Sequence, residues 1–284
     1  MSAASNDRIT LQGKNILLTG AAGGLGRQIA VTLARQGASL VLSGRDRAAL
    51  TTLRDELGRS GSRAEIVVAD LSRAEEAEGL VPRAEEALGP LDVVVSNAGI
   101  EIYAGYATHV RAELEATIGV NLLAPMLVVR SALPGMLERG SGRIVLVSSL
   151  SGKGPNPYGA AYAASKAGLV GLARSLRAEF HSRPVSFSVV CPSFITEASD
   201  GMYVRMQRAG LRAPRTFGTA TATACADAVL DAVLTGRPEI LVNSRPMRPL
   251  LALGELFPAL SSRLLVWLGI TSFFRSVAEQ RGRG

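Results

Sequence analysis

The chain of 284 residues has few cysteine, histidine and aromatic residues, and these shortages exclude several classes of protein. The two cysteines, Cys191 and Cys225, are far apart, and Cys191 lies in an apolar run. This spacing supports neither a disulfide framework nor a zinc site. The two histidines, His109 and His181, also lack metal-ligand spacing. We therefore expect no metal site and a reducing compartment, the cytoplasm.

The N-terminal residues 1–13 lack a long apolar segment and a signal-peptide pattern, and we expect them to be a flexible leader. The net charge is +7, and residues 237–284 carry +4 of it, with seven Arg against three Glu. No basic run is interleaved with aromatic residues, so we expect no nucleic-acid partner. The excess arginines suit solvated positions, a phosphate-bearing cofactor or attraction to an anionic surface.

A strand, a glycine turn and a helix are predicted near the start of the chain. Residues 15–19 (NILLT) are a short apolar run, and the helical pattern LGRQIAVTLARQG follows closely. Between them lies the spacing TG-x-x-x-G-x-G, with glycines at Gly20, Gly23, Gly24 and Gly26. Glycines let the backbone approach a pyrophosphate, whose charge then faces the helix N-terminus. The pattern favours a dinucleotide site, with an ordinary strand-to-helix turn as the alternative.

The residues after the second predicted strand are expected to lie beside the adenosine ribose. This strand ends near Ser43, and Gly44 and Arg45 follow it. An acidic side chain here would repel a 2′-phosphate, whereas an arginine pairs with one in fork geometry. We therefore expect NADP(H) to be favoured over NAD(H). Asp46 would either neutralise Arg45 or cap the next helix.

Ser149, Tyr162 and Lys166 lie in the stretch SSLSGKGPNPYGAAYAASK, which begins at Ser148. A Tyr and a Lys four positions apart on a helix share one face. The cation is expected to lower the pKa of the phenol, which would then exchange a proton near neutral pH. Ser149 follows the apolar run GRIVLV and so lies at the carboxyl end of a strand, where α/β sheets bind ligands. Taken alone, a surface Tyr and Lys on a helix is an equal alternative.

The glycine spacing, the serine and the YAASK segment together resemble the short-chain dehydrogenase/reductase family. The resemblance covers roughly residues 12–245. It implies an α/β fold, a Rossmann-type doubly wound parallel sheet of about seven strands with helices on both faces. It also implies that Tyr162 is the general acid or base and that Ser149 binds the reacting oxygen. Lys166 would lower the tyrosine pKa and hold the nicotinamide ribose hydroxyls.

The resemblance implies further site residues. Asn121 matches a catalytic position that supports a proton relay through water to Lys166, and a hydrogen-bonded core asparagine is the alternative. Asp70 matches a position that contacts the adenine amino group, and it also suits the cap of the following helix. The implied cofactor-binding residues are Gly20, Gly24, Leu25, Gly26, Arg45, Asp70, Leu71, Asn97, Ala98, Gly99, Tyr162, Lys166, Ile195 and Thr196.

Three positions depart from the family pattern. Ser96 replaces an asparagine before Asn97, and Gly23 stands where NADP-preferring relatives often carry a second basic residue. Ser193 replaces the glycine after Pro192 and makes the local backbone less free. The exact contacts of the carboxamide-binding residues that follow therefore stay open.

Residues 197–222 correspond to the segment where relatives keep a mobile substrate lid. A loop of this length is usually functional or disordered. Its large residues Met202, Tyr203, Met206 and Phe217 would either line a lipophilic pocket or pack the loop down.

The last segment, residues 246–284, does not fit the compact family plan. Its apolar residues follow helical spacing broken by Pro258 and Gly269, and each apolar piece is too short for a bilayer span. We expect an apolar helical C-terminal extension that is not an independent domain, beside a dinucleotide-binding catalytic domain over residues 1–245. The extension would cover the substrate mouth, dock on a partner subunit or lie in a membrane interface.

These observations predict an NADPH-dependent carbonyl reductase that is reversible as an alcohol dehydrogenase. The apolar extension and the methionines of the lid segment favour a lipophilic ketone or aldehyde as the small-molecule substrate. We expect a cytoplasmic homo-oligomer, a dimer or tetramer, with peripheral membrane contact through residues 246–284 as one alternative. The alternative function is a non-catalytic NADP(H)-binding sensor or scaffold, a class that commonly lacks one of the three residues Ser149, Tyr162 and Lys166.

Overall fold

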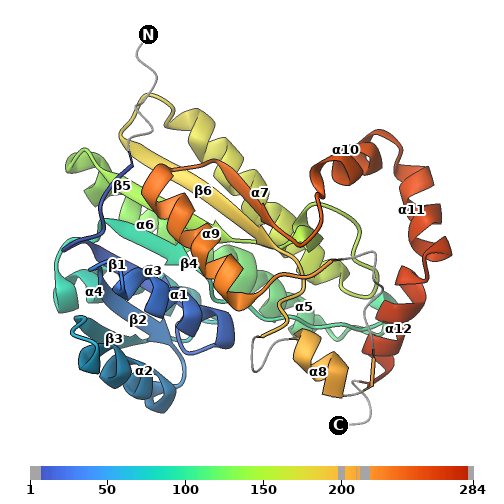
Figure 1. Cartoon of the computed structure of the whole chain (residues 1–284), viewed down its shortest axis with the longest axis horizontal. Helices are drawn as coiled ribbons and strands as arrows, with labels where there is room; N and C mark the ends of the chain where they lie inside the picture. The colour runs from blue at the N-terminus through green and yellow to red at the C-terminus, as the bar shows by residue number, and fades with distance from the viewer. Residues whose placement is uncertain (1–7, 198–201, 209, 212–217, 281–284) are drawn as a thin grey trace.

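The computed structural model describes residues 8–197, 202–208, 210–211 and 218–280 of the chain. Seven parallel strands form one sheet in the order β3-β2-β1-β4-β5-β6-β7 (Figure 1). The order reverses beside β1, and α/β sheets bind ligands at the carboxyl edge of such a switch point. The predicted doubly wound fold is confirmed. The strands are β1 (Asn15–Thr19), β2 (Ser39–Gly44), β3 (Ala64–Val68), β4 (Val93–Ser96), β5 (Gly142–Val147), β6 (Val185–Pro192) and β7 (Glu239–Val242).

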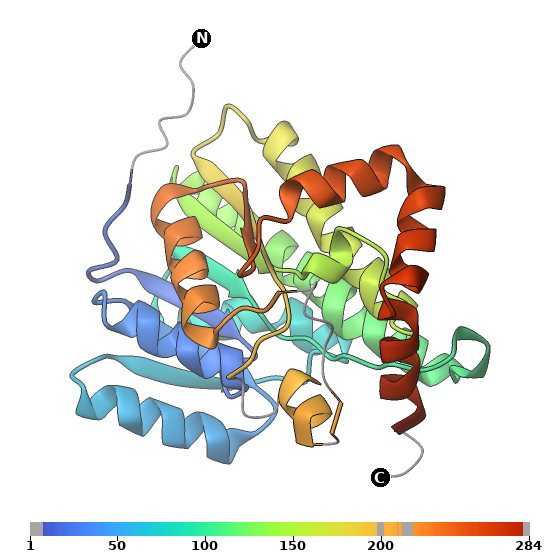
Figure 2. The same ribbon diagram turned by 45° about the vertical axis from the view of Figure 1, so that its right-hand side comes forward.

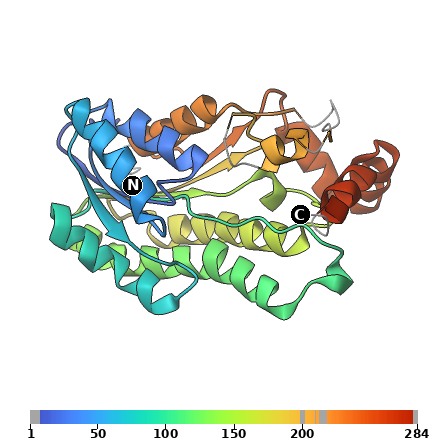
Figure 3. The same ribbon diagram turned by 90° about the horizontal axis from the view of Figure 1, so that it is seen from below.

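Helices cover both faces of the sheet (Figure 3). One face packs with α1 (Gly24–Ala34), α2 (Arg47–Arg59) and α9 (Ala222–Thr235) around one hydrophobic core. The other core involves α3 (Ala74–Glu78), α4 (Leu80–Leu88), α6 (Ala124–Glu138) and α7 (Ala160–Glu179). Valine, leucine and isoleucine dominate the strands because both faces of a parallel sheet are buried. The loops after the strands therefore meet at one edge.

A π-helical turn, Gly119–Leu123, joins α5 (Arg111–Ile118) to α6. In the described part of the chain, the combined stretch Arg111–Glu138 is the one helix long and apolar enough to cross a membrane by length and composition. Within its most apolar window 39% is buried inside the protein, and α6 packs on the sheet. Core helices commonly share these properties, so they are weak evidence for a membrane span.

Residues 8–13 differ from the predicted flexible leader. The Ile9 amide donates a hydrogen bond of 2.9 Å to the Leu234 carbonyl, and Leu11 is buried in the core of α1 and α9. This part of the prediction was wrong because Leu234 and the other α9 residues that hold this segment lie far along the sequence, which local composition does not reveal. Residues 1–7 lie outside the described residues.

The chain ends in three helices, α10 (Arg248–Leu256), α11 (Pro258–Trp267) and α12 (Ile270–Gln280), which arch over one end of the molecule (Figure 2). The breaks lie at the predicted Pro258 and Gly269. Helix α12 packs against the body: Tyr103 and Phe274 stack with ring centres 5.4 Å apart. A third hydrophobic cluster surrounds this pair and comprises the buried residues Tyr103, Met206, Ile270, Phe273, Phe274 and Val277.

Candidate active site

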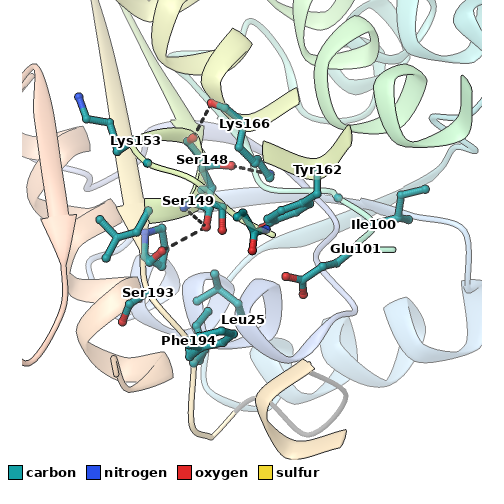
Figure 4. Close-up of a pocket in the computed structure, with 18 of the residues that line it drawn as sticks. Leu25, Ile100, Glu101, Ser148, Ser149, Lys153, Tyr162, Lys166, Ser193 and Phe194 are labelled. Atoms are coloured by element: carbon teal, nitrogen blue, oxygen red, sulfur yellow. Dashed lines mark hydrogen bonds between the residues drawn. The ribbon is translucent and has the colours of Figure 1, made fainter. Parts of the chain in front are cut away.

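A large cavity opens at the carboxyl edge of the strands (Figure 4). Its volume is about 1330 Å³, which exceeds the roughly 300–1,000 Å³ of an ordinary small-molecule pocket. The loops after β1 to β4 line one part of it, and the loops after β5 and β6 with helices α10, α11 and α12 line the other. It therefore has room for a dinucleotide and a substrate together.

The predicted glycine turn lies at one end of this cavity, between β1 and α1. Gly20 has φ +65°, a conformation that favours glycine, and a Cβ there would approach Ala98 Cα to 2.8 Å. A Cβ on Gly26 would overlap the carbonyl oxygen of Gly20. Gly24 is the first residue of α1, and the first turn of this helix contains no acidic side chain. The turn thus presents main-chain N–H groups and a helix N-terminus, which suits a phosphate.

The adenosine end contains Arg45, Asp70 and Leu71, all of which line the cavity. Asp46 accepts a hydrogen bond of 3.0 Å from the Ala49 amide and caps α2, so this alternative for Asp46 is confirmed. Arg45 is exposed beside the cavity. The pKa of Asp70 is lowered, chiefly by the hydrogen bond from the Ser72 amide and less by the charge of Arg45.

Asn97, Ala98 and Gly99 form the floor between the two parts of the cavity. The Asn97 and Ala98 amides donate to Thr19 Oγ1 at 3.0 and 3.1 Å, and Asn97 Nδ2 donates to the Thr19 and Gly20 carbonyls. These bonds tie the end of β4 to the glycine turn. A Cβ on Gly99 would lie 3.3 Å from Lys166 Nζ, so the absence of a side chain leaves space for the lysine.

Ser149, Tyr162 and Lys166 come together where the two parts of the cavity meet (Figure 4). Tyr162 and Lys166 lie one turn apart on α7, and Ser149 directly follows β5 and Ser148. The Ser149 hydroxyl donates a hydrogen bond of 3.4 Å to the Pro192 carbonyl, and it lies close enough to Tyr162 to lower the pKa of that phenol. Lys166 is 4% exposed, and its Nζ atom donates a hydrogen bond of 3.0 Å to the Val147 carbonyl. The predicted cluster therefore exists as a geometric unit.

The electrostatics of Tyr162 differ from the prediction. Its pKa is raised, mainly by burial and further by the charge of Glu101, while the interaction with Ser149 acts in the opposite direction. Burial also lowers the pKa of Lys166 to about 8, and Glu101 partly opposes this shift. The expectation that Lys166 brings the tyrosine pKa down is wrong here, because burial raises this pKa and Lys166 is not among the groups that shift it. The Tyr162 phenol is therefore neutral at physiological pH.

Asn121 lies at the π-helical turn and is fully buried. Its side chain forms two 2.8 Å hydrogen bonds with the main chain of Ile100, and its Nδ2 atom donates to Ser165 Oγ at 3.1 Å. π-Helical turns often occur at functional sites. The bonds fix the loop after β4 beside α7, as the core-asparagine alternative describes, and the water relay stays a prediction.

Ile195 lines the cavity, and Thr196 is not among its lining residues. The Thr196 amide and hydroxyl both donate to the Ala220 carbonyl, at 3.0 and 3.4 Å. In the lid segment, Met206 of α8 (Met202–Arg208) packs in the cluster around α12, as expected if it holds the loop down. Phe217 and the side chains of Met202 and Tyr203 lie outside the described residues.

Comparison with known proteins decides the family of this chain. A family model described as short chain dehydrogenase matches residues 14–206. The chain belongs to the short-chain dehydrogenase/reductase family. It is 36% identical over 277 residues to the ketoacyl reductase HetN of Nostoc sp., a match that covers 96% of this chain and 95% of that protein. It is also 36% identical to the oxidoreductase UcpA of Salmonella typhimurium over 186 residues, 65% of this chain and 70% of that protein.

A solved short-chain dehydrogenase has the same architecture. The crystal structure of a short-chain dehydrogenase/reductase from Burkholderia phymatum in complex with NAD superposes with a TM-score of 0.77 and 26% identity. The alignment covers 89% of this chain and 96% of that one. Together with the family match, this makes the chain an NAD(P)-dependent oxidoreductase that binds a nicotinamide cofactor. The glycine turn and the side-chain-free floor at Gly99 fit such a cofactor.

Sequence reasoning missed several residues that line the cavity of this dehydrogenase. Glu101 follows the Asn-Ala-Gly segment by two positions, and its acidic side chain in the loop after a buried strand was the available signal. Phe194 follows β6 and packs on Phe273 and Phe274 of α12 with ring centres 6.4 and 6.1 Å away. This contact has no signal in the local sequence, because α12 lies far along the chain.

Proposed function

We propose that the enzyme uses NADPH to reduce a lipophilic ketone or aldehyde to an alcohol, reversibly. One observation carries this proposal. The Tyr162 hydroxyl, beside Ser149, lies where the glycine-lined part of the cavity meets the part lined by the apolar extension. A carbonyl group at this point would contact a proton donor while its apolar remainder faces α10 and α11.

Each polar residue of the cluster has a distinct function in this proposal. The bound nicotinamide supplies the hydride. Tyr162 transfers its proton to the carbonyl oxygen, and Ser149 donates a hydrogen bond to the same oxygen. The raised pKa of Tyr162 keeps it protonated for the reductive direction. Lys166 holds the ribose hydroxyls and a positive charge, and Asn121 positions the loop after β4 through Ile100.

The preference for NADP(H) over NAD(H) is supported by Arg45. This exposed guanidinium lines the adenosine end of the cavity, and Asp46 is engaged by the Ala49 amide at the start of α2. An arginine in this position suits a 2′-phosphate. The relative from Burkholderia phymatum was solved with NAD, so the preference of this chain needs its own measurement.

The extension supports a lipophilic substrate. We propose that residues 1–245 form the catalytic domain and that the extension is part of the same catalytic unit. Leu251, Leu264, Leu265 and Leu268 line the cavity opposite the loops of the body. The match to the ketoacyl reductase HetN covers 96% of this chain, so it includes part of residues 246–284. Of the three alternatives for this segment, cover of the substrate mouth has this direct support.

We also propose that the outer side of the extension rests on an anionic membrane surface, from which a lipophilic substrate would enter. Leu256 and Trp267 are 73% and 80% exposed, and Arg263 is exposed nearby in the sequence. Apolar side chains beside arginines suit interfacial binding. Flotation with anionic liposomes tests this proposal, with loss of binding expected for the double variant Leu256→Ser/Trp267→Ser. A protein that stays unbound in its wild-type form would contradict it.

A cytoplasmic homo-oligomer, a dimer or tetramer, completes the proposal, because short-chain dehydrogenases typically oligomerise. The helical stretch of α5 and α6 exposes the apolar residues Ile118, Leu123 and Met126, which supports an interface there. Sedimentation of the wild type and of Leu123→Glu tests it. We expect a smaller assembly for the variant.

The decisive experiment is NADPH oxidation over a panel of ketones, with Tyr162→Phe as the control. We expect turnover by the wild type and a loss of roughly 10²–10⁴-fold in kcat for the variant. NADPH binding by the variant, measured by fluorescence, should be retained. If neither NADPH nor NADH is oxidised with any ketone although both bind, the non-catalytic sensor or scaffold becomes the better explanation.

A further inference from the structure

A carboxylate lies beside the reacting hydroxyl, on the substrate side of the cavity. Glu101 belongs to the loop after β4, and its side chain points into the cavity near Tyr162 (Figure 4). Its Oε1 atom accepts a hydrogen bond of 3.0 Å from the Tyr103 hydroxyl. That hydroxyl also accepts one of 3.1 Å from Asn156 Nδ2. Because Phe274 stacks on the Tyr103 ring, three separate segments fix this carboxylate.

The charge of Glu101 reaches both residues of the proton-transfer pair. It contributes to the raised pKa of Tyr162 and opposes the lowering of the Lys166 pKa by burial. The proposed reduction needs no carboxylate at this point, since Tyr162 supplies the proton. A fixed negative charge in a partly buried cavity instead favours a hydrogen-bond donor and disfavours an anion in the substrate.

The other end of the substrate space is mainly apolar, and Glu255 of α10 also lines it. Helices α10 and α11 contribute Leu251, Leu264 and Leu265 to the wall, Leu268 follows α11, and α12 contributes Ile270 and Phe274. A matching ligand therefore has two ends, a donor group near Glu101 and an apolar chain that extends toward the helices. The carbonyl lies between them, at Tyr162.

We propose that Glu101 makes the enzyme select long-chain ketones that carry a hydrogen-bond donor, an ammonium or a hydroxyl group, on the carbon next to the carbonyl. This inference rests on the proposed carbonyl reductase function and names its substrate class. The donor binds the carboxylate while the Tyr162 hydroxyl contacts the carbonyl oxygen. The same carboxylate excludes 2-oxo acids, whose negative charge would lie next to it.

The test compares kcat/KM for three long-chain ketones of equal length, with an amino group, a hydroxyl group or no substituent next to the carbonyl. We expect the wild type to prefer at least one donor-bearing ketone over the plain one by roughly ten- to hundredfold. The Glu101→Gln variant keeps an acceptor for Tyr103. In this variant the ratio of kcat/KM for the donor-bearing ketone to kcat/KM for the plain ketone should fall at least several-fold, mainly because KM for the donor-bearing ketone rises. The variant also changes the pKa of Tyr162, and the ratio cancels that effect because all three ketones use the same proton donor.

The matched control is Glu255→Gln, because Glu255 is another carboxylate that lines the cavity, on α10. Glu255→Gln should prefer the donor-bearing ketone over the plain one by the same ratio of kcat/KM as the wild type. A second wild-type measurement is inhibition, which we expect to be weak for a 2-oxo acid of the same chain length. Equal kcat/KM values for the three ketones, or a ratio unchanged in Glu101→Gln, would overturn this inference alone. Failure of every ketone to be reduced with NADPH or NADH would overturn the proposed function as well.

Discussion

The Nζ atom of Lys166 lies 5.8 Å from the ring centre of Tyr162 and donates a hydrogen bond to the Val147 carbonyl. Lys166 is buried and Tyr162 is half-buried, and their pKa values respond to the loss of solvent in opposite directions. The tyrosine is kept neutral, and the lysine titrates within reach of physiological pH. This pairing gives the site a measurable signature.

We expect kcat/KM for ketone reduction to decline above about pH 8, because Lys166 then loses its proton. Tyr162 stays protonated in that range, since its pKa is raised. Steady-state kinetics from about pH 6 to about pH 10 checks this prediction. In Lys166→Arg, the residual activity should decline at higher pH, because a guanidinium keeps its charge. A wild-type profile without a decline near pH 8 would contradict the assignment.

The buried amine should also cost stability at neutral pH. Burial lowers the pKa of Lys166 from its ordinary 10.5 to about 8. Between these two pH values the unfolded chain binds more protons than the native protein, so the free energy of unfolding rises with pH. The buried lysine therefore destabilises the native protein fully below pH 8, and this destabilisation disappears as pH rises toward 10.5. We expect the free energy of unfolding of Lys166→Met to exceed that of the wild type by about 2 kcal/mol near pH 7. This figure already subtracts about 1 kcal/mol for the lost hydrogen bond to the Val147 carbonyl.

Denaturant unfolding at two pH values measures this difference. The gap between Lys166→Met and the wild type should shrink near about pH 10, where the native lysine is neutral. A variant that is less stable than the wild type at neutral pH would show that the hydrogen bond to Val147 outweighs the burial of the charge.

Arg45 should decide the choice of cofactor. Arg45→Ala is expected to lower the NADPH-to-NADH ratio of kcat/KM by roughly ten- to hundredfold, because the 2′-phosphate loses a charge-assisted partner. The neighbouring Arg47→Ala is the matched control, since Arg47 is also exposed and is not among the lining residues of the cavity. Equal effects of the two variants would mean that general positive charge, and not the position of Arg45, attracts the cofactor.

The sequence predicted those features that depend on neighbouring residues. The apolar run of residues 15–19 with its glycine turn predicted β1 and α1, and the spacing of Tyr162 and Lys166 placed both on one face of α7. The direction of the Tyr162 pKa shift was not predictable, because its burial depends on segments far apart in the chain. Glu101 was missed for the same reason, since its position depends on contacts with Tyr103 and, through it, Phe274 of α12. The packing of residues 8–13 on the core near α9 likewise joins segments far apart in the sequence.

The extension should set the preference for chain length. Leu264 of α11 lines the cavity, whereas Leu256 of α10 is 73% exposed and is not among the lining residues. We expect Leu264→Asn to raise KM for long-chain ketones by roughly tenfold, because an apolar contact with the chain is lost. Short-chain ketones end before they reach α11, so their KM should stay within about twofold of the wild-type value. Leu256→Asn is the matched control, and both KM values should equal those of the wild type in the absence of membranes. If Leu264→Asn affected short and long ketones equally, the extension would support the fold of the site and would not contact the substrate.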